Sequence, residues 1–230
     1  MWFWDPTMII VVPASILSMY AQVKVNSTFN HYSKVLSARG MTGADAARYI
    51  LNKNGLYDIP IERVEGYLSD HYDPRTRVVR LSPGVYGSSS LAAVGVAAHE
   101  VGHAIQHDSG YLPLYIRNTV IPVTQIGSYL SIPLVILGVI LGSKPFVEFG
   151  IILFTAIVFF QLITLPVEYN ASHRAIDTLG GEGILSAQEL KGTRKVLNAA
   201  ALTYVAAAVM AVFQLLRLLV ISGAIGGSDD

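Results

Sequence analysis

Four apolar stretches, each close to the length that crosses a lipid bilayer, constrain the fold of this 230-residue chain most strongly. They cover residues 2–23, 120–141, 146–165 and 196–216. A helix needs about 20 apolar residues to cross a hydrocarbon core of about 30 Å. Hydrophobic residues make up 52% of the chain and charged residues only 14%, which is too apolar for a soluble domain of this size. We therefore expect a mainly α-helical integral membrane protein.

The first stretch could be either a secretory signal peptide or a retained membrane anchor. A signal peptide begins with a basic segment. The residues before Met8 contain Asp5 and neither Lys nor Arg, whereas Trp2 and Trp4 suit a membrane–water interface. We therefore favour a membrane anchor.

These stretches divide the chain into five segments. Residues 142–145, Gly-Ser-Lys-Pro, are typical of a turn, so the second and third stretches should form a helical hairpin. We expect a membrane helix over 1–23, a polar subdomain over 24–119, the hairpin over 120–165, a helical segment over 166–195 and a fourth membrane helix over 196–220.

The distribution of basic residues predicts the orientation of the membrane helices. Of the 16 Lys and Arg residues, ten lie between Lys24 and Arg117 and four between Arg174 and Lys195. Two membrane crossings separate these regions, so both should lie on one side, and the positive-inside rule makes that side cytoplasmic. Both chain termini would then lie outside the cell membrane.

The polar subdomain over 24–119 shows a mixed α+β pattern. Residues 42–55 begin with a Thr cap, carry Asp45 in the first turn and end at a Gly, as a short helix does. Residues 61–68 and 77–81 are strand candidates on either side of the proline turn at 73–76, which suggests a hairpin. The strand over 77–81 is either an ordinary strand or one whose edge pairs with an extended peptide.

An H-E-x-x-H motif from His99 to His103 carries the clearest chemistry. On a helix, positions i and i+4 lie on one face, so His99 and His103 could both bind one Zn²⁺ while Glu100 accepts a proton from water. Residues 88–107 favour a helix because possible Ser caps are followed by good helix formers without Pro. The chain has no Cys, which excludes thiolate ligands and disulfides.

A catalytic zinc site needs a third protein ligand. His107 lies on the same helix face, but eight residues, about 12 Å, separate it from His99, which is too far for one ion to bridge easily. Glu168 is the stronger candidate because it follows Pro166 at the predicted cytoplasmic end of the third apolar stretch. We expect Pro166 to end one helical segment and to let another begin.

Four sequence motifs resemble one family along nearly the whole chain. They are DHYDP at 70–74, LSPGVY at 81–86, AAHEVGHAIQ at 97–106 and VEYNAS at 167–172. Together they are similar to the YugP-like bacterial membrane neutral zinc metallopeptidases, of the gluzincin type and related to the heat-shock membrane protease and CAAX prenyl endopeptidase group. The resemblance implies a zincin-like subdomain, Zn²⁺ as cofactor, His99, His103 and Glu168 as ligands, and Glu100 as catalytic base.

The residues that follow Glu168 depart in one place from the broader gluzincin pattern. Ser172 stands where many gluzincins have an Asp that supports a ligand His, so the sequence leaves the supporting group open. Asn170 is a candidate for such support. His173, Arg174 or Tyr169 could stabilise the transition state, although each of the three residue types is more often structural.

We therefore expect a multi-pass zinc endopeptidase of the cell membrane that cleaves membrane or unfolded proteins at the cytoplasmic face. The alternative is a non-catalytic membrane binding or assembly protein with a structural zinc. The expected partners are a protein or peptide substrate and the lipid bilayer, with a homo-oligomer or another membrane protein also open. A net charge of zero gives no electrostatic reason to expect nucleic acid.

Overall fold

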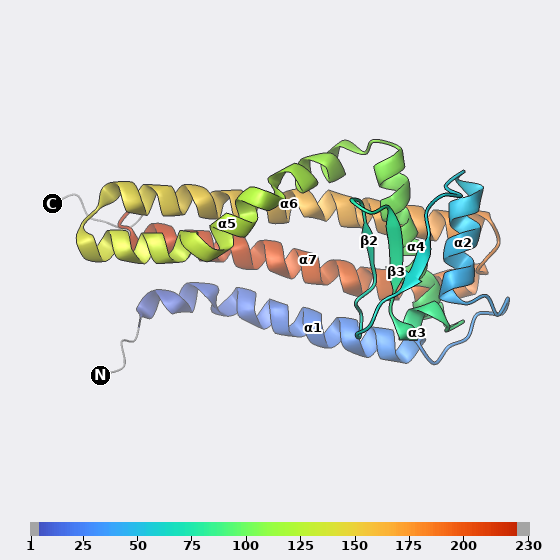
Figure 1. Ribbon diagram of the computed structural model, residues 1–230. Helices are drawn as coiled ribbons and strands as arrows, with labels where there is room; N and C mark the ends of the chain where they lie inside the picture. Colours follow the sequence, from blue (N-terminus) through green and yellow to red (C-terminus); the bar gives the residue numbers. More distant parts are fainter. Residues whose placement is uncertain (1–4, 225–230) are drawn as a thin grey trace. The chain divides into compact units, whose positions relative to one another are not determined.

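The computed structural model describes residues 5–224, and Figure 1 shows the elements in chain order. They are a 3₁₀ helix (Pro6–Val11), α1 (Val12–Tyr32), α2 (Gly43–Lys53), β1 (Ile61–Arg63), β2 (His71–Asp73), β3 (Val78–Leu81), α3 (Pro83–Tyr86), α4 (Leu91–Asp108), α5 (Leu112–Leu141), α6 (Lys144–Gly181) and α7 (Ala187–Ile221).

Four helical segments among the described residues are long and apolar enough to cross a membrane. They are Pro6–Tyr32, Leu112–Leu141, Lys144–Gly181 and Ala187–Ile221. Together with a single three-stranded sheet in the described chain, they confirm a mainly α membrane protein with a small α+β part. Trp2 and Trp4, which the sequence places at an interface, lie outside the described residues.

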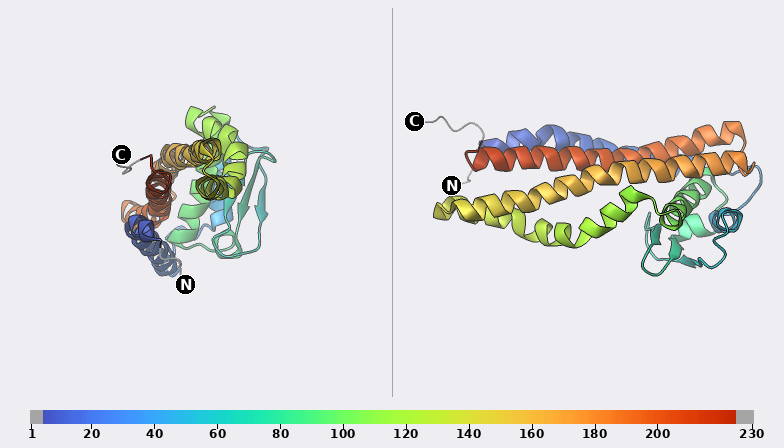
Figure 2. Two further views of the ribbon diagram at one scale, coloured as in Figure 1. Left: turned by 90° about the vertical axis from the view of Figure 1, so that its left-hand side faces the viewer. Right: turned by 90° about the horizontal axis from the view of Figure 1, so that it is seen from above.

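The chain divides into two compact units, and the first contains only helices. It comprises the described residues up to Ala21, residues Tyr115–Leu165 and the described residues from Thr203 on. Figure 2 shows these helical parts running alongside one another. Small residues allow close approach within the α5–α6 hairpin: a Cβ added to Gly150 would lie 2.7 Å from the Ser131 carbonyl oxygen.

An ion pair joins the residue before the 3₁₀ helix to α7 within this first unit. Arg217 of α7 donates to the Asp5 carboxylate at 2.5 Å and to the Thr7 hydroxyl at 3.2 Å. A charged group in a membrane helix is costly unless it finds a partner or an interface. The pair therefore provides a partner for the one charged residue in the apolar part of α7.

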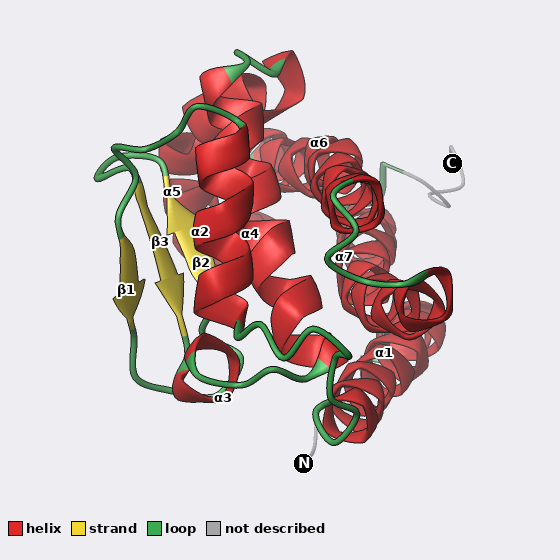
Figure 3. Cartoon of the chain, turned by 90° about the vertical axis from the view of Figure 1, so that its right-hand side faces the viewer, coloured by secondary structure: helices red, strands yellow, loops and turns green. Residues whose placement is uncertain are grey.

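The second unit contains the sheet, with strand order β1-β3-β2. It comprises Gln22–Leu114 and Pro166–Leu202. β1 runs parallel to β3 and β2 runs antiparallel to it, so β3 is central and β2 is an edge strand. Figure 3 shows α2 and α4 beside this sheet. α4 is hydrophobic on most of its surface and is accordingly buried along most of its length.

The expected pairing of residues 61–68 with 77–81 as a hairpin is wrong. The turn forms as expected, because the Asp73 carboxylate accepts from the Arg75 N–H and the Thr76 hydroxyl, but the strand leading into it is β2. The chain leaves strand geometry after Arg63, and Gly66 adopts a φ of +116°. Only β1 remains of the longer strand that the sequence suggested, and it pairs in parallel.

α2 agrees with the sequence prediction, whereas α6 differs from it. α2 forms as expected, with a capping box between Thr42 and Asp45. α6, in contrast, continues through Pro166, where we expected a break. Proline removes one helical hydrogen bond but does not end a helix whose neighbouring turns are stabilised by packing. Glu168 therefore lies on the same continuous helix as the third apolar stretch.

α4 and α6 approach each other closely at Gly102 in the second unit. A Cβ added there would lie 2.7 Å from the Ala171 carbonyl oxygen, so a larger residue would separate the two backbones. Gly102 lies between the two histidines of the motif and Ala171 lies three residues after Glu168. This contact therefore places Glu168 opposite the two histidines.

We predict that Gly102→Ala lowers the free energy of unfolding by about 1–3 kcal/mol, the usual cost of overpacking. Thermal and denaturant unfolding of the detergent-solubilised chain would measure the change. Gly181→Ala is the control, because nothing lies within 4 Å of an added Cβ there. Equal effects of the two substitutions would contradict a special role for the Gly102 contact.

Candidate metal centre

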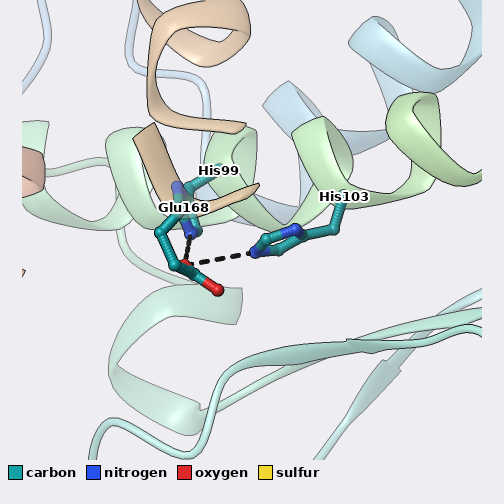
Figure 4. A group of neighbouring side chains, drawn as sticks. All are labelled: His99, His103 and Glu168. Carbon is teal, nitrogen blue, oxygen red and sulfur yellow. Dashed lines mark hydrogen bonds and ion pairs between the residues drawn. The ribbon is translucent and has the colours of Figure 1, made fainter. Parts of the chain in front are cut away.

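Three side chains from two helices of the second unit converge at one point (Figure 4). His99 Nε2 lies 3.2 Å from Glu168 Oε2, and His103 Nε2 lies 3.5 Å from the same oxygen. One potential ligand atom from each residue lies within 4.8 Å of the other two. Glu168 is buried, and both histidines are partly buried.

The donor set and its spacing suit Zn²⁺. Zinc in proteins binds His nitrogens and carboxylate oxygens at about 2.0–2.2 Å, and two ligands of a tetrahedral site then stand about 3.3 Å apart. The two His–Glu168 distances of 3.2 and 3.5 Å match that separation. Two neutral nitrogens and one carboxylate could hold the ion and would leave one tetrahedral position for water.

Gln106, which the sequence analysis did not identify as a site residue, orients His103. The amide Nε2 of Gln106 donates to the Val167 carbonyl oxygen at 2.8 Å and to Asn170 Oδ1 at 3.0 Å. A carbonyl oxygen can only accept, so this contact fixes the direction of the amide. Gln106 Oε1 then faces His103 Nδ1 at 3.0 Å, and Nδ1 must carry the hydrogen. His103 Nε2 therefore presents a lone pair to the cluster.

Ser172 lies next to the ring nitrogen of His99 for which the sequence left the supporting group open. Its hydroxyl lies 3.1 Å from His99 Nδ1, on the side of the ring away from Glu168. A serine hydroxyl can accept a hydrogen bond from Nδ1, as a carboxylate does in related arrangements. Both histidines thus have a polar partner at Nδ1 and leave Nε2 for the cluster.

Glu100 follows the first histidine and lies buried beside the edge strand. Its carboxylate Oε2 accepts a hydrogen bond from the Tyr72 N–H of β2 at 3.0 Å. Burial raises the pKa of Glu100 to about 7, because a charged carboxylate is poorly solvated there. A proton can therefore be held or released by this group near neutral pH.

The Tyr72 N–H points away from β3, since β2 is an edge strand and Glu100 accepts from it. The start of β2 is fixed by Asp70, whose carboxylate accepts from the Ser82 N–H at 2.7 Å and the Ser82 hydroxyl at 3.0 Å. Burial raises the pKa of Asp70 as well. Asp70 therefore links the two short motifs that precede α4.

The other candidates lie outside the cluster. His107 Nδ1 lies 2.8 Å from the Tyr72 hydroxyl. His173 pairs instead with Asp177 at 3.1 Å, and both of those side chains are exposed. Arg174 donates to Asn170 Oδ1 at 2.8 Å and so joins the hydrogen bonds around Gln106.

Tyr169 is half exposed. One sequence signal could have identified Gln106: it lies three residues after His103 on the same helix, a spacing at which two side chains can meet.

We predict that Gln106→Leu weakens zinc binding about 10- to 100-fold, the usual effect of removing a group that orients a ligand. Leucine keeps most of the volume and removes the acceptor for His103 Nδ1. Competition with a chromogenic chelator would measure the affinity, and the unfolding temperature of the metal-free chain would report folding. The exposed Gln188→Leu is the control. Unchanged affinity in the Gln106 variant would refute the orienting role.

Comparison with known proteins agrees with a zinc site. Residues 7–223 match the family described as "Putative neutral zinc metallopeptidase". The chain is 52% identical over 214 residues to "Putative membrane protease YugP" of Bacillus subtilis (strain 168), covering 93% of this chain and 94% of that protein. No solved structure matches. Zinc is the metal that the family implies, and the three-residue cluster could hold it. The chain belongs to this neutral zinc metallopeptidase family.

Proposed function

We propose that the chain is a gluzincin-type zinc endopeptidase that cleaves membrane or unfolded proteins at the cytoplasmic face of the cell membrane. The observation that carries the proposal is the convergence of three ligand atoms beside a buried carboxylate. His99, His103 and Glu168 are the proposed ligands. When bound, zinc lowers the pKa of a water molecule and polarises the carbonyl group of a substrate.

Glu100 is the proposed general base and acid. As the water oxygen bonds to the carbonyl carbon, the Glu100 carboxylate takes the water proton. It then passes that proton to the amine nitrogen as the carbon–nitrogen bond breaks. The Tyr72 N–H holds the carboxylate in place through the bond to its Oε2. Ser172, Gln106, Asn170 and Arg174 act as positioning residues in this proposal, whereas His173 has no role in it.

The substrate backbone is proposed to lie along β2. The sequence pointed to the strand over 77–81 for this role, but β3 has a neighbour on each side and so has no free edge. In a strand, the N–H and C=O of one residue point to the same side. The Tyr72 C=O should therefore point toward the Glu100 side and could accept a hydrogen bond from an extended substrate.

The cytoplasmic orientation is supported by the charges that flank the helices. The metal cluster lies on segments that carry most of the basic residues, whereas Lys144 is alone in the hairpin turn. The alternative of a structural zinc site would need a fourth protein ligand. Within residues 5–224, the group that could hold a metal contains three such residues. This favours an open catalytic site.

We predict that Glu100→Gln lowers the rate of peptide cleavage about 10²- to 10⁴-fold, the usual contribution of a general base. Zinc content should stay at the wild-type level, because Glu100 is not a proposed ligand. Cleavage of an unstructured fluorogenic peptide by the purified chain would give the rate, and elemental analysis would give the zinc content.

Glu65→Gln is the matched control, because Glu65 is exposed and lies outside the cluster. A zinc-loaded Glu100→Gln chain that cleaves at the wild-type rate would disprove the assignment. A wild-type chain that binds zinc through four protein groups and cleaves nothing would favour the structural alternative.

The orientation can be tested directly because the chain contains no Cys. We predict that Ser143→Cys, in the hairpin turn, reacts with a membrane-impermeant maleimide added to intact cells. Gln188→Cys, at the start of α7, should react only after the membrane is permeabilised. The opposite labelling pattern would reverse the proposed orientation, and the unsubstituted chain gives the background.

A further inference from the structure

A cavity between α1 and α7 in the second unit contains none of the metal-centre residues. Its volume is about 490 Å³. Its polar lining includes Lys24, Ser27, His31 and Tyr32 from α1, and Lys195 and Asn198 from α7. The proposed protease mechanism uses none of these residues.

The cavity carries positive charge without a compensating acid. Its lining contains two lysines and no Asp or Glu. α1 has no acidic residue, and Glu189 is the one acid of α7. The Glu189 carboxylate accepts instead from the backbone N–H groups of Ala38 and Ser186, at 2.6 and 2.7 Å. In the part of the chain that the structure describes, neither lysine has an ion-pair partner.

Both lysines stand where an apolar run ends. Lys24 is the first charged residue after the apolar part of α1, and Lys195 is the last before the apolar part of α7. In a membrane helix, such positions lie at the level of the lipid headgroups. The remaining lining includes the apolar Ala199 and Leu202. The cavity therefore combines cations with an apolar side, at the depth where lipid phosphates lie.

Close packing at this end of the two helices builds the cavity wall. A Cβ added to Gly192 of α7 would lie 2.7 Å from Cε1 of Tyr32, so the ring rests directly against the α7 backbone. The His31 ring packs edge-on against Tyr32, with 4.7 Å between the ring centroids. Tyr32 is thereby held between its two neighbours, with its hydroxyl available as a donor.

We propose that this cavity binds the phosphate of an anionic phospholipid headgroup. The Lys24 and Lys195 ammonium groups pair with the phosphate, and Asn198 and the Tyr32 hydroxyl donate to its oxygens or to the headgroup. Leu202 lies against the glycerol and the start of an acyl chain. A zwitterionic lipid is disfavoured because its own cationic group would lie close to the two lysines. Basic pockets between membrane helices recognise anionic headgroups in this way.

The test measures lipid retention by the purified full-length chain. Native mass spectrometry after equilibration with equal phosphatidylglycerol and phosphatidylcholine, with matched acyl chains, gives the ratio of the two bound lipids. Wild type should retain phosphatidylglycerol preferentially. In the double variant Lys24→Gln/Lys195→Gln, the ratio of bound phosphatidylglycerol to phosphatidylcholine should fall roughly tenfold, as expected for removing two lysines near an anionic headgroup.

The matched control is Lys34→Gln/Lys191→Gln, which removes the same charge from exposed lysines outside the cavity. It should keep the wild-type ratio. Equal ratios in wild type and the cavity variant, or an equal loss in both double variants, would overturn the proposal. Displacement of the lipid by millimolar inorganic phosphate would reassign the cavity to free phosphate.

A second measurement needs no substitution and is therefore independent of folding defects. Phosphatidylglycerol with a photoreactive group in the headgroup should cross-link the wild-type chain within residues 24–32 and 195–202. Cross-links confined to other segments would contradict the proposed site. Neither measurement depends on protease activity, so failure of the proposed catalytic mechanism would leave this test intact.

Discussion

The close contact between α4 and α6 at Gly102 is the constraint on which the metal centre depends. A helix can present two histidines at i and i+4 by itself, but the third donor must come from elsewhere in the chain. Because Gly102 has no Cβ, the α6 backbone at Ala171 can lie against α4. Glu168, almost one turn earlier on α6, then reaches both histidines, and Ser172, one residue later, reaches His99. One backbone contact thus brings both Glu168 and Ser172 to the histidines of α4.

The hydrogen bonds around the cluster fix the orientation of its side chains and the position of the hydrogen on His103. The hydrogen bond from Gln106 to the Val167 carbonyl oxygen fixes the orientation of the Gln106 amide. The amide oxygen then accepts from His103 Nδ1, so His103 Nε2 keeps its lone pair. A neutral imidazole oriented in this way needs no rearrangement to bind a cation, which favours both affinity and a single geometry. The buried Glu100 is held in a similar way by a backbone N–H of β2. The proposed chemistry therefore rests on groups whose directions are fixed by the fold.

Sequence patterns predicted the features that depend only on residues close together in the chain. The Thr42 cap, the histidine motif and the apolar helices are local signals, and each lies within one element. The convergence of Glu168 with the motif needed a topological argument and the family resemblance. The sequence did not indicate which strand pairs with β3, because that choice depends on contacts such as Asp70 with Ser82. The spacing from His103 was the one sequence signal for Gln106, but its orienting hydrogen bonds depend on partners on α6. The break expected at Pro166 did not form because packing overrides the local preference of proline.

X-ray absorption at the zinc edge of the purified wild-type chain would show directly which side chains bind the ion. We expect a four-coordinate ion with two imidazole nitrogens and two oxygens at about 2.0–2.2 Å, one oxygen from Glu168 and one from water. Glu168→Ala should remove the carboxylate contribution, whereas His107→Ala should leave the spectrum unchanged. A spectrum with three imidazoles, or one that Glu168→Ala does not alter, would contradict the assigned centre.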